Sequence, residues 1–382
     1  FSKIAGQKQH GSVSQRNKER SGLSIIDAFA PHFTNRCFGL FKQNESSIMD
    51  ANTPRNTLSE ADQQLVNGVL AGQRRALAKT ITLIESTRDD HQERANEILG
   101  ELLPHSGKAI RLGISGVPGA GKSTFIEALG IWLIDHGYKL AVLAVDPSSS
   151  VSGGSILGDK TRMEQLCQRP GAFIRPSPSA GSLGGVAAKT RESMLACEAA
   201  GYDVILVETV GVGQSETTVA GMVDMFILVQ LPNAGDDLQA IKKGIVEIAD
   251  LVAINKSDIN PQMSAIACAQ WKQAIQMLRP TSPNWRPPVI TLSALQKQGI
   301  DDFWNEIEKF REIMTKTGEL EEKRKKQALA WMWSMIEGGL RQRFRNHPQV
   351  HAALPKLSGE VASGQITPGV AARTLLDYLD QH

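Results

Sequence analysis

The sequence is short of cysteine, of long apolar runs and of net charge, and each shortage excludes a class of protein. Its four cysteines are scattered among 382 residues without a Cys-x-x-Cys pair, so neither a disulfide framework nor a structural zinc site is indicated. No apolar run approaches the roughly 18 residues that cross a bilayer, and the first residues lack a secretory apolar core. We therefore expect a soluble intracellular protein without membrane insertion.

The charges of the chain are almost balanced. Forty-two Lys and Arg residues against 40 Asp and Glu residues leave a net charge of +2, which provides no strong attraction to nucleic acid. Hydrophobic residues make up 41% of the chain, enough to bury one large core or two modest ones. We expect a main domain with smaller appendages and no nucleic-acid partner.

Residues 1–48 show no sustained helical or strand periodicity, and we assign them no fold. One interpretation is that translation starts at Met49 and that the preceding residues are upstream sequence or a disordered tail. The other is an organelle-targeting leader, because the segment is basic and contains several serines. The first interpretation predicts a cytoplasmic protein, and the second predicts a protein of the mitochondrial matrix.

Apolar periodicity divides the remaining chain into three parts. Residues 49–107 are predicted to form a helical extension, because Ser59 and Asp62 resemble a capping box and apolar residues then recur at helical spacing. Within residues 108–315, six short apolar runs alternate with helical segments and are typical of buried parallel strands. Residues 316–382 are predicted to form a second helical extension, whose charged run GELEEKRKKQ we interpret as a solvated helix face.

The predicted fold class is therefore α/β, a doubly wound, mostly parallel sheet with helical N- and C-terminal extensions. Ligands of such sheets bind at the carboxyl ends of the strands. The polar motifs of this sequence follow the predicted strands, so we expect them to meet at one edge of the sheet.

A phosphate-binding loop follows the first apolar run, IRLGIS. Residues 116–123, GVPGAGKS, satisfy the pattern G-x-x-x-x-G-K-[ST] and open a helical segment, which is the context that a P-loop requires. Glycines let backbone N–H groups surround phosphate oxygens, Lys122 should reach the β- and γ-phosphates, and Ser123 offers a hydroxyl to Mg²⁺. A merely glycine-rich turn is the alternative. The predicted nucleotide-contacting residues are Gly116, Gly119, Ala120, Gly121, Lys122, Ser123 and Thr124.

A guanine-reading motif follows the run LVAIN. In NKSD at 255–258, the carboxylate of Asp258 can accept both the ring N–H and the exocyclic amine of guanine, a donor pair that adenine lacks. One strand later, SAL at 293–295 resembles the G-domain loop whose backbone N–H contacts the guanine oxygen. NKSD alone is compatible with an ordinary surface turn, but with the P-loop it predicts GTP and GDP as the ligands. The predicted residues are Asn255, Lys256, Asp258, Ser293, Ala294 and Leu295.

A carboxylate for Mg²⁺ is predicted at Glu208, where the run YDVILVET ends and a Walker B acid would stand. Ordinary G domains have Asp at this position, and a solvated strand-end carboxylate is the alternative. Most regulatory GTPases place a water-orienting Gln after the following glycine, whereas this chain has Val212. We therefore expect slow intrinsic hydrolysis.

Two further loops follow strands on the same edge. The run KLAVLAVD ends at Asp146, and a Gly- and Ser-rich segment containing Asp159 follows, which we interpret as a switch. A Ser-rich turn capped by Asp146 and a solvated Asp159 are the alternatives. The loop with Gln239 and Lys242 follows the run MFILVQL, and we expect it to face the nucleotide side of the sheet as well. The alternative interpretation of this loop is an acidic helix start with solvated lysines.

Taken in order, the strings GVPGAGKST, VDPSSSVSGGSILGDKTRM, ETVGVGQSE, GDDLQAIKKG and NKSD closely resemble the MeaB/ArgK group of GTPases. The resemblance covers about residues 58–380 and leaves the first 48 residues outside. It implies a Rossmann-like G domain with helical extensions at both ends, the C-terminal one building a homodimer.

The resemblance also implies roles for individual residues. Asp146, Asp159 and Glu208 look like the carboxylates that arrange Mg²⁺ and water, with Glu in place of Asp as a feature of the family. Gln239 and Lys242 look like parts of a third switch that responds to a partner. The predicted catalytic residues are Lys122, Asp146, Asp159 and Glu208, and the predicted metal ligands are Ser123, Asp146, Asp159 and Glu208.

The resemblance further implies a GTP-driven chaperone for adenosylcobalamin-dependent acyl-CoA mutases, chiefly methylmalonyl-CoA mutase, which gates cofactor loading and protects the mutase. An older naming of the group, lysine-arginine-ornithine transport kinase, supposes instead phosphoryl transfer to a binding protein, which fits poorly with a guanine-selecting NKSD. A metabolic kinase would need a lid and an acceptor pocket that we do not locate. A binding-only module would be excluded by multiple-turnover hydrolysis.

Overall fold

The structure, a computed structural model, describes residues 58–146, 163–178, 183–209, 214–232, 243–278 and 280–379. All of them belong to one compact unit, Leu58–His382. The predicted site residues Asp159, Gln239 and Lys242 lie outside the described residues, as does the segment 1–57, and Asp146 is described by its backbone only.

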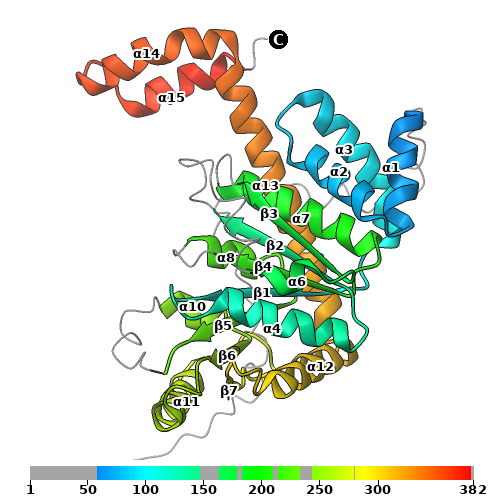
Figure 1. The fold of residues 1–382 in the computed structure, drawn as a ribbon. Helices are drawn as coiled ribbons and strands as arrows, with labels where there is room; N and C mark the ends of the chain where they lie inside the picture. The colour runs from blue at the N-terminus through cyan, green and yellow to red at the C-terminus, as the bar shows by residue number, and fades with distance from the viewer. Residues whose placement is uncertain are drawn as a thin grey trace, which may run out of the picture. The chain divides into compact units, whose positions relative to one another are not determined.

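A seven-stranded sheet forms the centre of this unit, and every neighbouring pair of its strands is parallel (Figure 1). The strand order is β3-β2-β4-β1-β5-β6-β7. The α/β fold class predicted from the sequence is confirmed. The strands are β1 (Ile110–Gly116), β2 (Leu140–Asp146), β3 (Ala172–Pro178), β4 (Val204–Thr209), β5 (Met225–Gln230), β6 (Leu251–Ile254) and β7 (Val289–Thr291).

Six of these strands coincide with the apolar runs of the sequence, whereas β3 was not predicted. Pro176 and Pro178 lie within β3 and interrupt the strand signal of its sequence, AFIRPSP. Proline cannot donate to a neighbouring strand and is therefore tolerated at a sheet edge. β3 occupies such an edge, paired only with β2 among the described strands.

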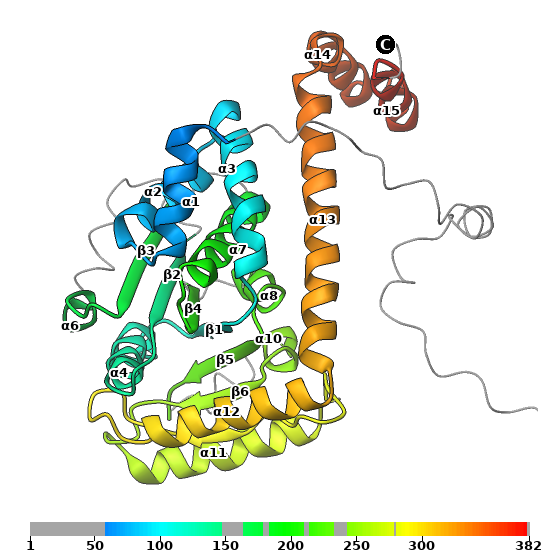
Figure 2. The same ribbon diagram turned by 90° about the vertical axis from the view of Figure 1, so that its right-hand side faces the viewer.

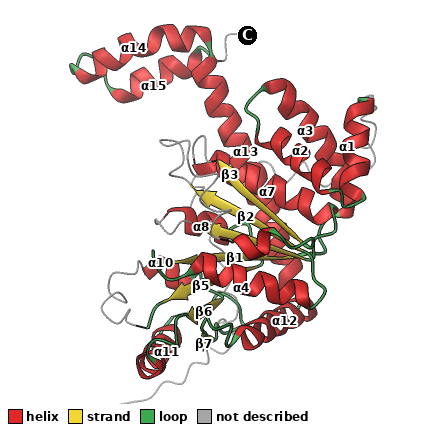
Figure 3. Cartoon of the chain, viewed as in Figure 1, coloured by secondary structure: helices red, strands yellow, loops and turns green. Residues whose placement is uncertain are grey.

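Helices surround the sheet (Figure 3). Before and between the strands lie α1 (Glu60–Leu70), α2 (Arg74–Glu85), α3 (Asp89–Leu102), the 3-10 turn η2 (Leu103–His105), α4 (Lys122–Asp135), α6 (Glu164–Cys167), α7 (Leu183–Ala199), α8 (Gln214–Ala220), α10 (Lys243–Glu247) and α11 (Pro261–Gln276). After the last strand follow α12 (Ile300–Lys316), α13 (Glu319–Asn346), α14 (Pro348–Ala362) and α15 (Pro368–Asp377). None of the helices within the described ranges is long and apolar enough for a membrane crossing.

The two faces of the sheet bury separate apolar clusters. Alternate residues of β1, such as Leu112 and Ile114, pack with α4 and α12, where Phe125 and Phe303 meet edge to face at 4.9 Å between ring centroids. Residues of the opposite face, such as Ile205, pack with residues of α7 and of α1, α2 and α3. Figure 2 shows these helices next to one another beside the sheet. The helices that precede the sheet in sequence therefore share a core with it.

The first helix begins as predicted, because the Ser59 side chain accepts a hydrogen bond from the backbone N–H of Asp62 at 3.2 Å. The charged run at the start of α13 is different from its prediction. Its residues Lys325 and Lys326 are solvated, but Lys323 and Arg324 bond to buried acids at the amino ends of β5 and β6. The interpretation of the whole run as a solvated face was therefore wrong.

Candidate functional site: the loops at the carboxyl ends of the strands

The predicted P-loop connects β1 to α4. Gly119 and Gly121 have φ angles of 80° and 83°, in the left-handed region that favours glycine, and α4 begins directly afterwards at Lys122. The Lys122 ammonium lies back over the loop, where it donates to the carbonyl oxygen of Gly116 at 2.8 Å. A turn of N–H groups, a helix N-terminus and an ammonium group thus converge, which is the arrangement that binds phosphate.

Close packing against β5 also requires glycine at the start of the loop. A Cβ atom at Gly116 would lie 2.1 Å from the carbonyl oxygen of Val229, so no other residue fits without moving the strand. The loop is therefore held rigidly where it leaves the sheet.

Asn255 joins three of the predicted loops. Its side chain is buried, and its amide nitrogen donates to the carbonyl oxygen of Ala120 in the P-loop at 2.8 Å. Its amide oxygen accepts from the backbone N–H groups of Ala294 at 3.0 Å and of Lys256 at 2.8 Å. One side chain thus fixes the P-loop, NKSD and SAL relative to one another. A Cβ at Gly121 would lie 2.8 Å from this amide nitrogen, which is a second reason for glycine there.

The remaining residues of these loops surround the same region. Asp258 and Thr124 are exposed, Ser293 is buried, and the side chain of Leu295 is 74% exposed. Lys256 adopts a φ of 60°, uncommon for a residue other than glycine. Asp258 and Leu295 are thus accessible to a ligand next to loops that Asn255 holds in place.

Two side chains with oxygen atoms that could bind a cation meet beside the P-loop. The hydroxyl of Ser123, in the first turn of α4, donates to Oε1 of Glu208 at 3.2 Å. Asp146 ends β2 one position beyond the pairing of Val145 with Thr209, so its backbone lies beside the end of β4. The described residues contain no group of three or more His, Cys, Asp or Glu side chains that could hold a metal ion. Ser123 and Glu208 are the two predicted ligands that the structure brings together.

Our reading of the sequence missed a buried contact beneath this site. The Thr209 hydroxyl donates to the Ser115 hydroxyl at 2.9 Å, and both side chains are fully buried. The two residues neighbour Glu208 and Gly116, so their bond joins the end of β4 to the start of the P-loop. A polar residue at the end of each of two apolar runs was the available signal.

Comparison with known proteins decides the family. A family model described as "Methylmalonyl Co-A mutase-associated GTPase MeaB" matches residues 77–349. The chain belongs to the MeaB family.

Named relatives agree with this membership. A protein of Caulobacter vibrioides described as a GTPase is 52% identical over 312 residues, covering 82% of this chain and 96% of the relative. The GTPase ArgK of Escherichia coli is 51% identical over 282 residues, covering 74% and 84%. The mouse "Methylmalonic aciduria type A homolog, mitochondrial" is 47% identical over 334 residues, covering 84% and 80%.

A solved structure extends the similarity to three dimensions. The crystal structure of a protein described as "LAO/AO transport system kinase" superposes with a TM-score of 0.69 at 39% sequence identity, covering 85% of this chain and 99% of that one. As a member of the MeaB family, the chain is a GTPase that binds guanine nucleotide and hydrolyses GTP. The resemblance inferred from the sequence is confirmed.

Proposed function

We propose that this MeaB-family GTPase assists an adenosylcobalamin-dependent acyl-CoA mutase, methylmalonyl-CoA mutase, in loading its cofactor and in protecting it from inactivation. The observation that supports this partner is the family model, which is described as mutase-associated and matches residues 77–349. The mouse relative, named after methylmalonic aciduria, supports the same partner. GTP hydrolysis would then switch the protein between two shapes that the mutase distinguishes.

The geometry supports binding of the phosphates and of the guanine base by different loops. Lys122 and the N–H groups of the P-loop would hold the β- and γ-phosphates, and Asp258 would accept the two N–H donors of guanine. Asn255 fixes the distance between these two subsites through its bonds to Ala120 and Ala294. A ligand that carries phosphates and guanine at the matching separation would bind most tightly, because the loops need little reorganisation on binding.

The donors near the phosphates fit Mg²⁺. The Ser123 hydroxyl and the Glu208 carboxylate are hard oxygen ligands 3.2 Å apart, of the kind that hold this ion together with substrate phosphates and water. When bound, Mg²⁺ would neutralise charge on the phosphate oxygens. We further propose that Asp146 and Asp159 complete the arrangement of Mg²⁺ and water, and that Gln239 and Lys242 respond to the partner.

We also propose that residues 49–107 form the N-terminal helical extension and that residues 108–315 form the G domain. The C-terminal helices of residues 316–382 would build a homodimer. Large apolar side chains in the middle of α13, between residues 329 and 340, are 42–59% exposed and recur at helical spacing. Such a patch is typical of a protein interface. These side chains are Leu329, Met332, Trp333, Met335, Ile336 and Leu340.

Light scattering tests the homodimer. An Ile336→Glu variant should elute as a monomer if the patch is the interface, and a dimeric I336E variant would contradict the assignment.

For the cellular location of the protein, we propose the cytoplasm, or the mitochondrial matrix if residues 1–48 are a leader. The name of the mouse relative, which includes "mitochondrial", supports the second possibility.

The proposed function is tested by hydrolysis of GTP and ATP with and without methylmalonyl-CoA mutase and adenosylcobalamin. A Lys122→Ala variant serves as the control for contaminating hydrolases. GTP-selective turnover that the mutase accelerates is the expected result. GTP turnover indifferent to the mutase would reject this partner.

A second candidate is a kinase or ATPase of a lysine, arginine and ornithine transport system that transfers phosphate to a binding protein. The description of the structurally similar protein as a transport system kinase favours it. Equal or better use of ATP, with phosphate appearing on a binding protein, would support it. The guanine-type motif at 255–258 argues against it.

A further inference from the structure

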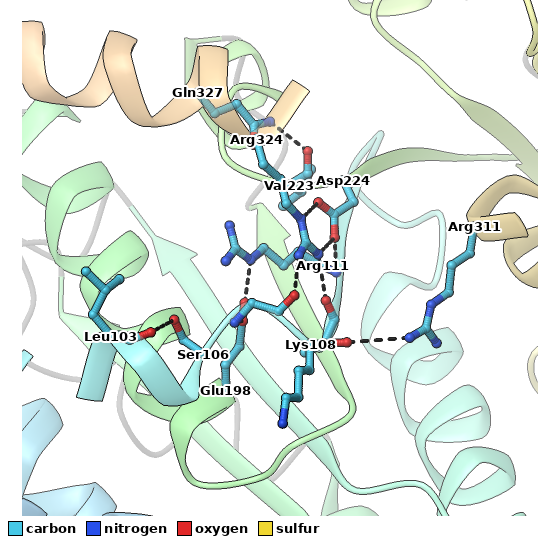
Figure 4. A network of polar contacts seen from close by, with 12 residues as sticks. Leu103, Ser106, Lys108, Arg111, Glu198, Val223, Asp224, Arg311, Arg324 and Gln327 are labelled. Carbon is cyan, nitrogen blue, oxygen red and sulfur yellow. Dashed lines mark hydrogen bonds and ion pairs between the residues drawn. The ribbon is translucent and has the colours of Figure 1, made fainter. Parts of the chain in front are cut away.

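The first turns of α13 are bound to the sheet by a buried ion pair (Figure 4). Arg324 donates to both carboxylate oxygens of Asp224, at 2.8 and 2.6 Å, and to the carbonyl oxygens of Gly107 and Ala109. Asp224 is itself fixed to β1, because its backbone N–H and carboxylate bond to the backbone of Arg111, both at 2.8 Å. The Arg324 end of α13 is therefore anchored to the sheet.

A neighbouring residue strengthens the same anchor. Lys323 donates to the carbonyl oxygen of Asp224 at 2.6 Å and pairs with Asp250 at 3.3 Å. Asp250 directly precedes β6 and accepts from the backbone N–H of Phe226 in β5 at 2.9 Å. Two adjacent positions of α13 thus hold the amino ends of two strands.

One turn further along, α13 contacts a different element. Gln327 donates to the carbonyl oxygen of Val223 at 2.8 Å (Figure 4). The ring centroid of Trp331 lies 5.9 Å from the guanidinium carbon of Arg191 in α7. An N–H group of the same guanidinium donates to the carbonyl oxygen of Gly221 at 2.8 Å. Both carbonyl oxygens belong to the turn that ends α8, so this part of α13 is connected to α8 as well as to the sheet.

In sequence, the short helix α8 lies between the end of β4, which carries Glu208, and this turn. It begins at Gln214, five residues after the end of β4 at Thr209, and its seven residues span about 10 Å. Val219 and Val223 pack closely on β1, where a Cβ on Gly113 would lie 2.9 Å from each. Val219 of α8 and Val223 of the following turn thus pack against the same strand, and close-packed interiors transmit strain between neighbouring groups.

Beyond Trp331, α13 has no buried side chain up to its end, and residues 332–343 are all exposed. At 1.5 Å per residue, Gln327 is about 4.5 Å from the anchor at Arg324, and Asn346 is about 33 Å from it. When the helix rotates about the anchor, the displacement of Asn346 is therefore about seven times the displacement of Gln327. A movement of about 0.5 Å at Gln327 becomes about 3.5 Å where α14 begins.

We propose that the turn 221–224 couples the nucleotide state to the direction of α13. Arg324 on Asp224 is the pivot, and Gln327 on Val223 is the contact that α8 moves when the groups around Glu208 respond to GTP or GDP. The proposal rests on the proposed function, because Glu208 must sense the nucleotide. It adds a route from the phosphates to the exposed apolar patch of α13.

Hydrogen–deuterium exchange of the full chain tests this route. Peptides covering residues 214–224, 319–331 and 332–346 are compared with GDP and with a non-hydrolysable GTP analogue, both with Mg²⁺. In the native chain we expect exchange in all three segments to depend on the nucleotide. In Gln327→Met, which removes one hydrogen bond and keeps the volume, only 214–224 should still respond. Gln342→Met, on the exposed half of the same helix, is the matched control and should behave as the native chain.

Binding of a fluorescent GDP and GTP analogue supplies a second readout. Coupling is reciprocal, so Gln327→Met should change the ratio of the two dissociation constants by about two- to tenfold, the equivalent of one hydrogen bond. Tight nucleotide binding with no nucleotide-dependent exchange in 319–346 would overturn the coupling and leave the proposed function standing. Failure of the native chain to bind guanine nucleotide would overturn both.

Discussion

The side-chain amide of Asn255 donates to the carbonyl oxygen of Ala120 over 2.8 Å, across 135 positions of sequence. Because the same side chain accepts from Ala294 and Lys256, the loops proposed to bind phosphate and base are held together before any ligand arrives. Preorganisation of this kind lowers the cost of binding. It also makes the nucleotide site depend on a residue that need not touch the nucleotide.

We therefore expect Asn255→Ala to weaken the binding of GDP and to lower stability. The change leaves the buried N–H of Ala294 and the carbonyl oxygen of Ala120 without partners, at a cost of about 1–3 kcal/mol for each group. Isothermal titration with GDP and urea unfolding measure the two effects. Asn305→Ala, at an exposed position of α12, is the matched control. Unchanged GDP affinity in N255A would show that the loops keep their places without this amide.

Asp258→Asn should change which base is bound. An amide in place of the carboxylate keeps one acceptor oxygen for the ring N–H but presents an N–H group to the exocyclic amine of guanine. That N–H group can instead donate to the carbonyl that xanthine has in place of the amine. We expect the affinity for GTP to fall by about tenfold or more and the affinity for xanthosine triphosphate to rise, since each lost charged hydrogen bond is worth about 1.5–3 kcal/mol.

Competition of both nucleotides against a fluorescent GDP measures this exchange of preference. Asp377→Asn, at an exposed position of α15, controls for the loss of one negative charge. An equal loss of both nucleotides in D258N would place the recognition of the base elsewhere.

Glu208→Gln should raise the Mg²⁺ concentration needed for half-maximal GTP hydrolysis. The amide keeps the length of the side chain and its contact with Ser123 but removes the charge that attracts the cation. Loss of such a ligand or of its supporting partner costs about 10- to 100-fold in metal affinity or activity. Magnesium titrations of the initial rate measure the shift, with Glu312→Gln, at an exposed position of α12, as the control. If the magnesium dependence of E208Q equals that of the native chain, Glu208 does not act through the ion.

Local patterns predicted much of this site because each motif is continuous in sequence. A P-loop is recognisable in eight residues, and the apolar run before it reveals its strand, so its place at the end of β1 follows. The contacts of Asn255 with Ala120 and Ala294 are not visible in this way. They join loops that only the order of β1, β6 and β7 in the sheet brings together.

The charged run at the start of α13 shows a second limit. Lys325 and Lys326 pair with glutamates four residues earlier, which is what helical spacing alone predicts. Arg324 looks the same in sequence but lies against Asp224, whose carboxylate is fully buried. Which side of a charged helix is buried depends on the acids of distant elements, and no periodicity within the run contains that information.

In the helical extension before the sheet, a buried carboxylate, that of Asp62 in α1, pairs with the partly exposed Arg94 of α3. Arg94 reaches both carboxylate oxygens of Asp62, at 2.6 and 3.1 Å, and Asp62 is 2% exposed. The hydrogen bonds from Arg94 hold the pKa of the Asp62 carboxyl below its usual value of 3.8, although burial opposes them. Asp62→Asn should lower the free energy of unfolding at pH 7 by about 1–3 kcal/mol.

This loss should depend on pH in a defined direction. Because the pKa of Asp62 is lower in the folded state, its contribution is complete above the unfolded value near 3.8 and disappears as pH falls through the folded pKa. The difference between the native chain and D62N should therefore be constant from about pH 5 to 7 and shrink below pH 4. Urea unfolding followed by circular dichroism, repeated across this range, measures it.

Asp90→Asn provides the matched control for this pH series. Asp90 also receives two hydrogen bonds from one arginine, Arg88, at 3.0 and 2.8 Å, but its side chain is 57% exposed. Exposed pairs of this kind contribute little, because water competes for both partners. D90N should therefore leave the unfolding midpoint nearly unchanged. Equal losses in D62N and D90N would mean that burial does not decide what the Asp62–Arg94 pair contributes.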